Sequence, residues 1–268
     1  MFVSIIIPAY KQEKTIKEDI TRINNAMSKT RWEYEIIVVV DGFLDKTFEE
    51  ALSLDLEKVS VVGYHDNKGK GYAVRYGMAR ADGDFILFID SGMDINPNGI
   101  SMILEHLEWY NADIVIGSKV HPESKSNYPL IRKIYSFGYH LIVRFLFGLR
   151  LRDTQTGLKV YKREVLDKVL PRLLVKKFAF DIEILSVAHR LGFNKIYEAP
   201  VEVTWSGKNT SFSPLIIFDK QIRNMLIDTL AIFYRLKILQ YYDDDKKRSW
   251  TYDPELHLNV NTGKVEKV

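Results

Sequence analysis

The chain has 268 residues and a mass of 31.2 kDa, a size that suits one large domain or two small ones. Its formal net charge of +3 is too small to predict nucleic acid as a partner. The sequence contains no cysteine, which excludes disulfides and thiolate metal sites.

The first 118 residues alternate short apolar runs with amphipathic segments. The runs predict strands at 3–7, 34–40, 59–64, 85–89 and 114–117, and the segments between them predict helices near 16–27, 45–52, 72–81 and 100–107. Continuous runs rich in valine, isoleucine and phenylalanine are typical of strands that are buried on both faces. The repeated strand–helix units therefore predict an α/β fold with a mostly parallel sheet sandwiched by helices.

Beyond residue 118 the pattern changes. Polar loops are expected at 121–129 and 150–159, helices at 130–149, 180–191 and 214–242, and one or two strands within 195–205. We expect one sheet-forming domain over 1–210, an amphipathic helix over 211–242, and a loose polar tail over 243–268.

Several of the predicted strands end on residues that can hold a ligand. The run YEIIVVV leads into Asp41, FILFI leads into Asp90, and the first strand stops at Pro8. Turns after strands favour such residues in any case, so each alone is more simply a turn residue. Together they favour a site, because ligands of open α/β sheets lie beyond the carboxyl ends of the strands. Two carboxylates there suggest a nucleotide site with a divalent metal.

The segment Asn67-Lys68-Gly69-Lys70-Gly71 is a glycine-rich turn before a predicted helix. Such a turn lets the backbone approach an anion at a helix N-terminus. A lone turn of this kind is more often merely solvated. The first strand is not followed by G-x-G-x-x-G, which disfavours a dinucleotide-dependent oxidoreductase.

The segments SIIIPAYKQEKTI, EIIVVVDGFLDKT, NKGKGYAVRYGM and FILFIDSGMD resemble family 2 glycosyltransferases of the GT-A fold, in the order and spacing of that family. The later runs RDTQTGLKVYKREVL and FAFDIE are similar to polyprenyl-phosphate and dolichyl-phosphate hexose synthases. The similarity is greatest to the dolichyl-phosphate glucosyltransferases, with the dolichyl-phosphate mannose synthases next. The resemblance implies that 1–210 is a glycosyltransferase catalytic domain.

The resemblance also implies roles for individual residues. The nucleotide would be bound by Pro8, Ala9, Tyr10, Glu13, Asp41, Lys70, Asp90 and Ser91, and the catalytic groups would be Lys70, Arg75, Asp90 and Asp181. Lys119 and Arg132 match the positions that bind the acceptor phosphate. The loop with Asp153, Gln155, Thr156 and Gly157 would lie near the sugar.

The metal motif departs from the pattern of the family. Relatives usually carry Asp-x-Asp, whereas this chain has Asp90-Ser91-Gly92-Met93-Asp94, with glycine in place of a carboxylate. We expect Mg²⁺ or Mn²⁺ to be bound by Asp90 and Asp94, with water or diphosphate oxygens as the other ligands. The alternative is a weakened dependence on metal.

The implied reaction is transfer of a hexose, with inversion, from a nucleotide sugar to polyprenyl or dolichyl phosphate. The runs in the second half favour UDP-glucose as donor, with GDP-mannose next. A phosphate acceptor is already anionic and needs no general base, whereas a sugar hydroxyl does. If the acceptor is a hydroxyl, Asp181 is the expected base; it is equally well explained as a carboxylate in the first turn of a helix. A third possibility, suggested by Gly92, is a non-catalytic protein that binds nucleotide sugars.

The segments 130–149 and 214–242 are apolar on one side and carry lysine or arginine on the other. Such helices suit a membrane surface, although most amphipathic helices simply pack on their own sheet. The N-terminus does not resemble a signal peptide, and no apolar run predicts a spanning helix. We therefore expect a peripheral protein on the cytoplasmic face of a membrane.

Overall fold

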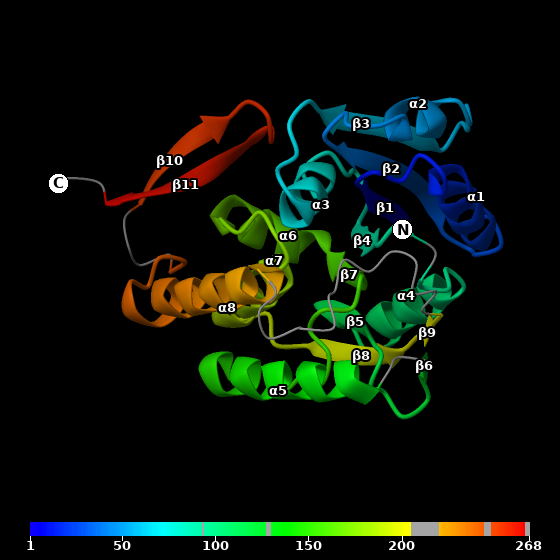
Figure 1. The fold of residues 1–268 in the computed structure, drawn as a ribbon. Helices are drawn as coiled ribbons and strands as arrows, with labels where there is room; N and C mark the ends of the chain where they lie inside the picture. Colours follow the sequence, from blue (N-terminus) through cyan, green and yellow to red (C-terminus); the bar gives the residue numbers. More distant parts are fainter. Residues whose placement is uncertain (93, 127–129, 205–219, 244–247, 266–268) are drawn as a thin grey trace.

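The computed structural model describes residues 1–92, 94–126, 130–204, 220–243 and 248–265. Its centre is a seven-stranded sheet in the order β3-β2-β1-β4-β7-β5-β8 (Figure 1). The strands are β1 (Phe2–Ala9), β2 (Glu33–Asp41), β3 (Val59–Tyr64), β4 (Phe85–Ile89), β5 (Ile114–Ser118), β7 (Leu158–Lys162) and β8 (Ile196–Pro200). A short parallel pair joins β6 (Lys125–Ser126) to β9 (Glu202–Val203), and an antiparallel hairpin joins β10 (Arg248–Asp253) to β11 (Leu258–Val265).

Helices cover both faces of the sheet. One face packs against α1 (Ile16–Met27), α2 (Thr47–Leu52) and α4 (Gly99–Trp109). The other packs against α3 (Lys70–Met78), α5 (Leu130–Phe147), α6 (Arg163–Val169), α7 (Phe180–Arg190), α8 (Lys220–Phe233) and the short helices η1 (Leu170–Arg172) and η3 (Tyr234–Ile238). Alternate residues of one strand enter the two cores, as Ile5 and Ile6 of β1 do. The predicted α/β sandwich is confirmed.

The parallel register explains where the strand ends meet. β1 lies between β2 and β4, and Ile5 is opposite Ile36 on one side and Leu87 on the other. Every residue of β4 is buried, as expected for a central strand of a parallel sheet. The carboxyl ends of these three strands therefore share one edge, which brings Asp41 and Asp90 to the same side of the sheet.

The strand β7 was expected to begin as a polar loop, because 150–159 is rich in polar residues. It instead runs antiparallel between β4 and β5 and joins the two halves of the sheet. The Lys159 side chain is fully buried in this strand. A buried lysine makes a core strand hard to recognise from its residue pattern, because lysine is almost never buried without a partner.

The C-terminal region also differs from the sequence prediction. Residues 248–265, expected to be a loose tail, form the β10–β11 hairpin, whose Leu256 is 1% exposed and belongs to the core. The hairpin is anchored by a hydrogen bond from the Tyr241 hydroxyl to the Asn261 carbonyl. The part of the predicted helix 214–242 that the structure describes begins at Lys220. Residues 211–219 lie outside the described residues.

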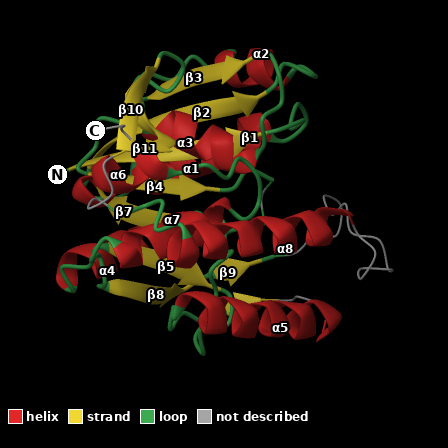
Figure 2. Cartoon of the chain, turned by 90° about the vertical axis from the view of Figure 1, so that its left-hand side faces the viewer, coloured by secondary structure: helices red, strands yellow, loops and turns green. Residues whose placement is uncertain are grey.

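The helices α5 and α8 lie side by side, as Figures 1 and 2 both show. The hydroxyls of Tyr139 and Thr229 are hydrogen-bonded at 2.7 Å, and the rings of Phe147 and Phe233 meet edge to face. Neither these helices nor any other within the described residues combine the length and the apolar character needed to cross a bilayer.

Candidate active site

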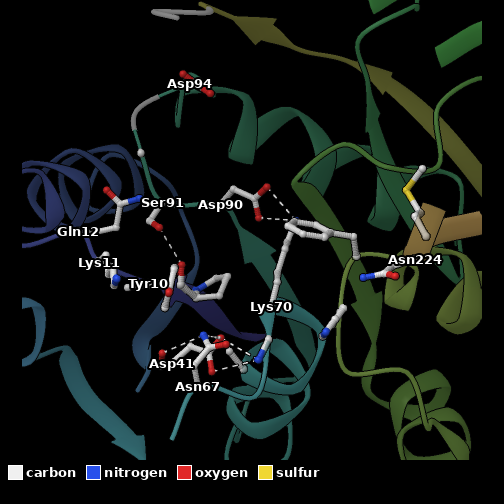
Figure 3. A pocket seen from close by; sticks show the side chains of 18 of the residues that line it. Tyr10, Lys11, Gln12, Asp41, Asn67, Lys70, Asp90, Ser91, Asp94 and Asn224 are labelled. Atoms are coloured by element: carbon white, nitrogen blue, oxygen red, sulfur yellow. Dashed lines mark hydrogen bonds and ion pairs between the residues drawn. The ribbon is translucent and has the colours of Figure 1, made fainter. Parts of the chain in front are cut away.

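A cavity of about 800 Å³ opens at the carboxyl edge of β1, β2 and β4 (Figure 3). That volume is within the usual range for small-molecule sites. Predicted site residues that line it are Pro8, Ala9, Tyr10, Asp41, Lys70, Asp90, Ser91 and Asp94. The remaining lining residues are Lys11, Gln12, Asn67, Gly69, Ala73, Gly92, Lys177, Phe178, Asn224, Met225 and Asp228. The structure thus brings the predicted strand-end residues together around one cavity.

Asp41 is held at the end of β2 by neutral hydrogen-bond donors. Its carboxylate accepts hydrogen bonds from the Tyr64 hydroxyl at 2.9 Å and from Asn67 Nδ2 at 2.8 Å. It also accepts hydrogen bonds from the backbone N–H groups of Lys68 and Gly69, at 2.7 and 2.9 Å. Burial and then the charge of Asp41 raise the pKa of Tyr64, so its hydroxyl stays protonated and remains a donor. Asp41 therefore fixes the turn that precedes α3.

The glycines of this turn are needed for packing against the loop before α7. A Cβ atom on Gly69 would lie 2.6 Å from the Lys176 carbonyl oxygen, and one on Gly71 would lie 2.4 Å from Phe180 Cβ. Gly69 also has a φ of +102°, in the region that favours glycine. The sequence analysis explained these glycines by the approach of an anion, and the structure supplies a steric reason that applies without one.

Lys70 begins α3 and points at Asp90. Its ammonium donates a hydrogen bond to Asp90 Oδ2 at 2.8 Å. Although burial alone would lower it, the pKa of Lys70 is raised by the carboxylates of Asp90 and Asp181. Asp90 has room for this arrangement because residue 157 is glycine: a Cβ atom there would lie 2.0 Å from Asp90 Oδ2. Lys70 is therefore a fixed positive charge inside the cavity.

A second buried pair lies behind Lys70. Lys159 Nζ donates hydrogen bonds to Asp181 Oδ1 and to the Thr156 carbonyl oxygen, both at 2.5 Å. Burial lowers the pKa of Lys159, and the charge of Asp181 opposes that effect. Lys70 Nζ lies 4.0 Å from Asp181 Oδ2. The charges thus alternate in the order Asp90, Lys70, Asp181, Lys159, and the sequence analysis missed the last of them.

The predicted acceptor-phosphate residue Lys119 lies at the end of β5. Its ammonium donates to Thr156 Oγ1 at 2.9 Å and pairs with Asp153 at 3.0 Å. Burial would raise the pKa of Asp153, but Lys119 and the hydrogen bond from Thr156 hold it below the usual range. Lys119 does not line the cavity, and the side chain of the other predicted residue, Arg132, lies outside the described residues.

The loop 153–157 reaches the cavity wall through Gln155. Its Nε2 donates a weak hydrogen bond to Met225 Sδ at 3.0 Å, and Met225 lines the cavity from α8. Asn224 and Asp228 line it from the same side of that helix. For the segment 214–242 the sequence favoured a membrane surface over packing on the sheet, and the lining role was missed. The spacing of one helical turn from 224 to 228 was a usable signal.

Two further predicted residues lie away from the cavity lining. Arg75 is 9% exposed and donates a hydrogen bond from Nη1 to the Leu173 carbonyl at 2.7 Å. Burial lowers the pKa of this arginine in spite of nearby carboxylates such as Glu183. Glu13 accepts a hydrogen bond from the Lys46 backbone N–H at 3.3 Å. Contact of either with a bound nucleotide stays a prediction.

The Asp90 carboxylate retains the capacity to bind a cation. Its Oδ1 lies 2.8 Å from Lys70 Nζ but is buried without hydrogen-bond geometry to any described residue. Asp94 lines the same cavity, with its carboxylate turned away from Asp90 (Figure 3). The described residues contain no cluster of three or more potential metal ligands. This donor set fits an ion such as Mg²⁺, which is commonly bound by one or two carboxylates together with substrate phosphates and water.

The mostly parallel sheet, the helices that cover it and the carboxylate-lined cavity at its carboxyl edge have the architecture of the GT-A fold. The family model described as glycosyl transferase family 2 matches residues 4–170, and the chain belongs to this family. The family and the enzyme class that the sequence motifs predict are both confirmed.

The chain is similar to the dolichyl-phosphate beta-glucosyltransferases of Drosophila melanogaster and Homo sapiens. The first is 34% identical over 220 residues, which cover 76% of this chain and 66% of the relative. The second is 31% identical over 219 residues, which cover 76% and 67%. The chain thus spans about two thirds of the length of each relative.

Among solved structures, the chain resembles glucosyl-3-phosphoglycerate synthase from Mycobacterium tuberculosis in complex with Mn²⁺, UDP and phosphoglyceric acid. The TM-score is 0.65 at 20% identity, and the match covers 94% of this chain and 83% of the other. At this identity the likeness establishes the shared fold.

Proposed function

We propose that this glycosyltransferase transfers glucose from UDP-glucose to dolichyl phosphate or a similar polyprenyl phosphate, with inversion at the anomeric carbon. The names of its relatives support the acceptor and the sugar. The observation that carries the proposal is the buried pair of Asp181 and Lys159. This pair matters because Asp181 is the expected general base if the acceptor is a hydroxyl.

A hydroxyl acceptor must lose a proton to a positioned base, whereas a phosphate oxygen attacks as an anion. Asp181 is 3% exposed, binds the Lys159 ammonium, and does not line the cavity. A carboxylate that is paired with a buried ammonium and does not line the cavity is badly placed to take a proton from an acceptor bound there. This arrangement suits an acceptor that arrives already ionised.

The chain would then act through alignment and charge. The Asp41 side of the cavity, with Asn67 and Tyr10, would hold the base and ribose of the donor. Lys70 would stabilise the diphosphate as it leaves. GDP-mannose is the second candidate donor.

A divalent cation, Mg²⁺ or Mn²⁺, would be held by Asp90, with Asp94 as a second carboxylate from the same cavity. When bound, it would supply positive charge to the departing diphosphate. The position of both carboxylates on one cavity supports this assignment.

A lipid-linked acceptor calls for contact with a membrane surface, and α5 and α8 offer suitable faces. Exposed apolar side chains recur at one-turn spacing on α5, at Phe137, Leu141 and Phe145. They recur in the same way on α8, at Ile227 and Leu230, and at Tyr234, where η3 begins. Paired helices with such faces suit the boundary between headgroups and acyl chains. We infer that the protein binds the cytoplasmic face of a membrane peripherally through these helices.

The test is incubation with radiolabelled UDP-glucose or GDP-mannose, a short polyprenyl phosphate and Mn²⁺, followed by lipid extraction. We expect label from UDP-glucose in the lipid phase as a β-linked glucosyl phosphate, with little label from GDP-mannose. Label that enters only a glycolipid with a free hydroxyl would support the hydroxyl-acceptor alternative. Donor binding without any turnover would identify a non-catalytic binding protein instead.

A further inference from the structure

The C-terminal hairpin presents an acidic turn, residues 253–255, to the start of α3 (Figure 1). The Lys68 ammonium pairs with both carboxylate oxygens of Glu255. Arg80 Nη2 donates a hydrogen bond to the Glu255 carbonyl oxygen at 2.8 Å. Asp253 Oδ1 shapes the turn by accepting hydrogen bonds from the backbone N–H groups of Glu255 and Leu256. The hairpin is therefore held by polar contacts to the residues that flank α3, and its Leu256 is buried in the core.

Lys68 connects this hairpin to the cavity. Its backbone N–H donates to Asp41 Oδ1 at 2.7 Å, on the cavity side of the turn. Its side chain points the other way, with Nζ 4.6 Å from the centre of the Tyr72 ring. Lys68 itself does not line the cavity, although its neighbours Asn67 and Gly69 do. One residue thus binds the hairpin with its side chain and the cavity carboxylate with its backbone.

The Glu255 carboxylate has two partners at the start of α3, Lys68 and Tyr72. Burial would raise the pKa of Glu255, but hydrogen bonds from Lys68 and from the Tyr72 hydroxyl hold it below its usual range. The carboxylate therefore contacts the turn through Lys68 and the first turn of α3 through Tyr72. The hairpin begins at residue 248, far beyond the family-matched segment 4–170.

We propose that Glu255 is a positioning residue for nucleotide binding: through Lys68 it holds the turn 67–70 in the conformation that presents Asp41, Asn67 and Lys70 to the donor. This inference rests on the proposed function, because it takes the occupant of the cavity to be a nucleotide sugar. The C-terminal hairpin is then an outer support of the donor site.

The expected effect on donor binding is modest, because the Lys68–Glu255 ion pair is partly exposed to solvent. The side chains of Lys68 and Glu255 are 27% and 38% exposed, so their ion pair is partly screened by solvent. We expect Glu255→Gln to raise the Kd of UDP and UDP-glucose roughly fivefold, with kcat at saturating donor changed by less than about twofold. Lys68→Met should weaken binding by a similar factor, and the double variant by no more than either single one.

The matched control is Glu33→Gln. It removes the Lys58–Glu33 ion pair at the opposite end of β2, where the side chains are more exposed. This control should leave the donor Kd unchanged. Calorimetric titration gives the Kd values, and thermal unfolding verifies that each variant is folded.

Backbone amide exchange of the turn 67–70 supplies a readout that needs no donor. Glu255→Gln should accelerate exchange at the Lys68 and Gly69 amides, which bind Asp41. Unchanged exchange together with unchanged Kd would overturn the proposal. So would a lower melting temperature at unchanged Kd, or strictly additive effects in the double variant. If the unaltered protein binds no sugar nucleotide, the proposed function fails, and exchange alone decides whether Glu255 holds the turn.

Discussion

Asp41 and Asp181 are two carboxylates on the same side of the molecule, each 3% exposed, and they are compensated in opposite ways. Asp41 accepts hydrogen bonds from a hydroxyl, an amide and two backbone N–H groups, all of them neutral. Asp181 binds the ammonium of Lys159, a full opposite charge. The first lies at the cavity wall with neutral partners only, whereas the second does not line the cavity and is paired with a cation.

The contrast shows two uses of a buried acid. Neutral donors converging on Asp41 shape a turn without cancelling its charge. The Asp181–Lys159 pair is instead buried next to Lys70, whose ammonium lies between the carboxylates of Asp90 and Asp181. Changes that remove one charged group from such an arrangement give the clearest tests.

The largest effect is expected from Lys159→Met. Removing the ammonium leaves Asp181 buried without an opposite charge, so the free energy of unfolding should fall by about 3–5 kcal/mol. Urea denaturation measures this loss. The control Lys162→Met, on the same strand but with a partly exposed side chain, should cost less than about 1 kcal/mol. Equal losses in both variants would mean that the buried pair contributes nothing special.

Next comes Asp90→Asn, which removes the carboxylate that faces Lys70 in the cavity. We expect kcat to fall by about 10²–10³-fold, because Asp90 would hold the cation that offsets the negative charge of the departing diphosphate. Steady-state kinetics with saturating donor measure it. Asp84→Asn, which alters the other end of the same strand, should retain near-normal kcat. A fall of less than about tenfold for Asp90→Asn would remove this residue from the catalytic machinery.

A smaller effect is expected from Asp41→Asn. The amide presents N–H groups where Asp41 now accepts hydrogen bonds from the N–H groups of Lys68 and Gly69, so the turn loses part of its support at a cost of about 1–3 kcal/mol. Urea denaturation and donor titration should both show the change. Asp66 is the exposed residue that precedes Asn67 in the sequence, and Asp66→Asn should alter neither the stability nor the donor binding.

The smallest effect concerns acid stability and Asp153. Because the pKa of this carboxyl is lower in the folded chain than its ordinary value of 3.8, the unfolded chain binds more protons there. Its contribution to stability is therefore present above about pH 4 and is lost as the pH falls through the folded pKa. Denaturation between pH 6 and about 3 should show a shallower pH dependence for Asp153→Asn. An identical slope would contradict the assignment.

Much of the first half of the fold was predictable because its signals are local. The runs at β1, β2 and β4 are continuous and apolar, and the turn-favouring residues at or near their ends located Pro8, Asp41 and Asp90. The first strand was expected to stop at Pro8, but β1 continues through Pro8 to Ala9, because both residues still pair with β2. The rest depends on contacts between distant residues. Lys159 can be buried in β7 because Asp181, 22 residues later, meets it in space. The lining face of α8 and the pairing of Glu255 with Lys68 likewise connect segments whose sequences carry no mark of one another.

One steric detail has a consequence for natural variation. The hydrogen atom on the α-carbon of Gly157 is all that fits beside the Asp90 carboxylate, since a methyl group there would overlap it. Even alanine at this position would push the acid out of place, so a change that looks conservative would act as a change to the acid itself. Descendants of this chain can therefore enlarge residue 157 only if residue 90 changes as well.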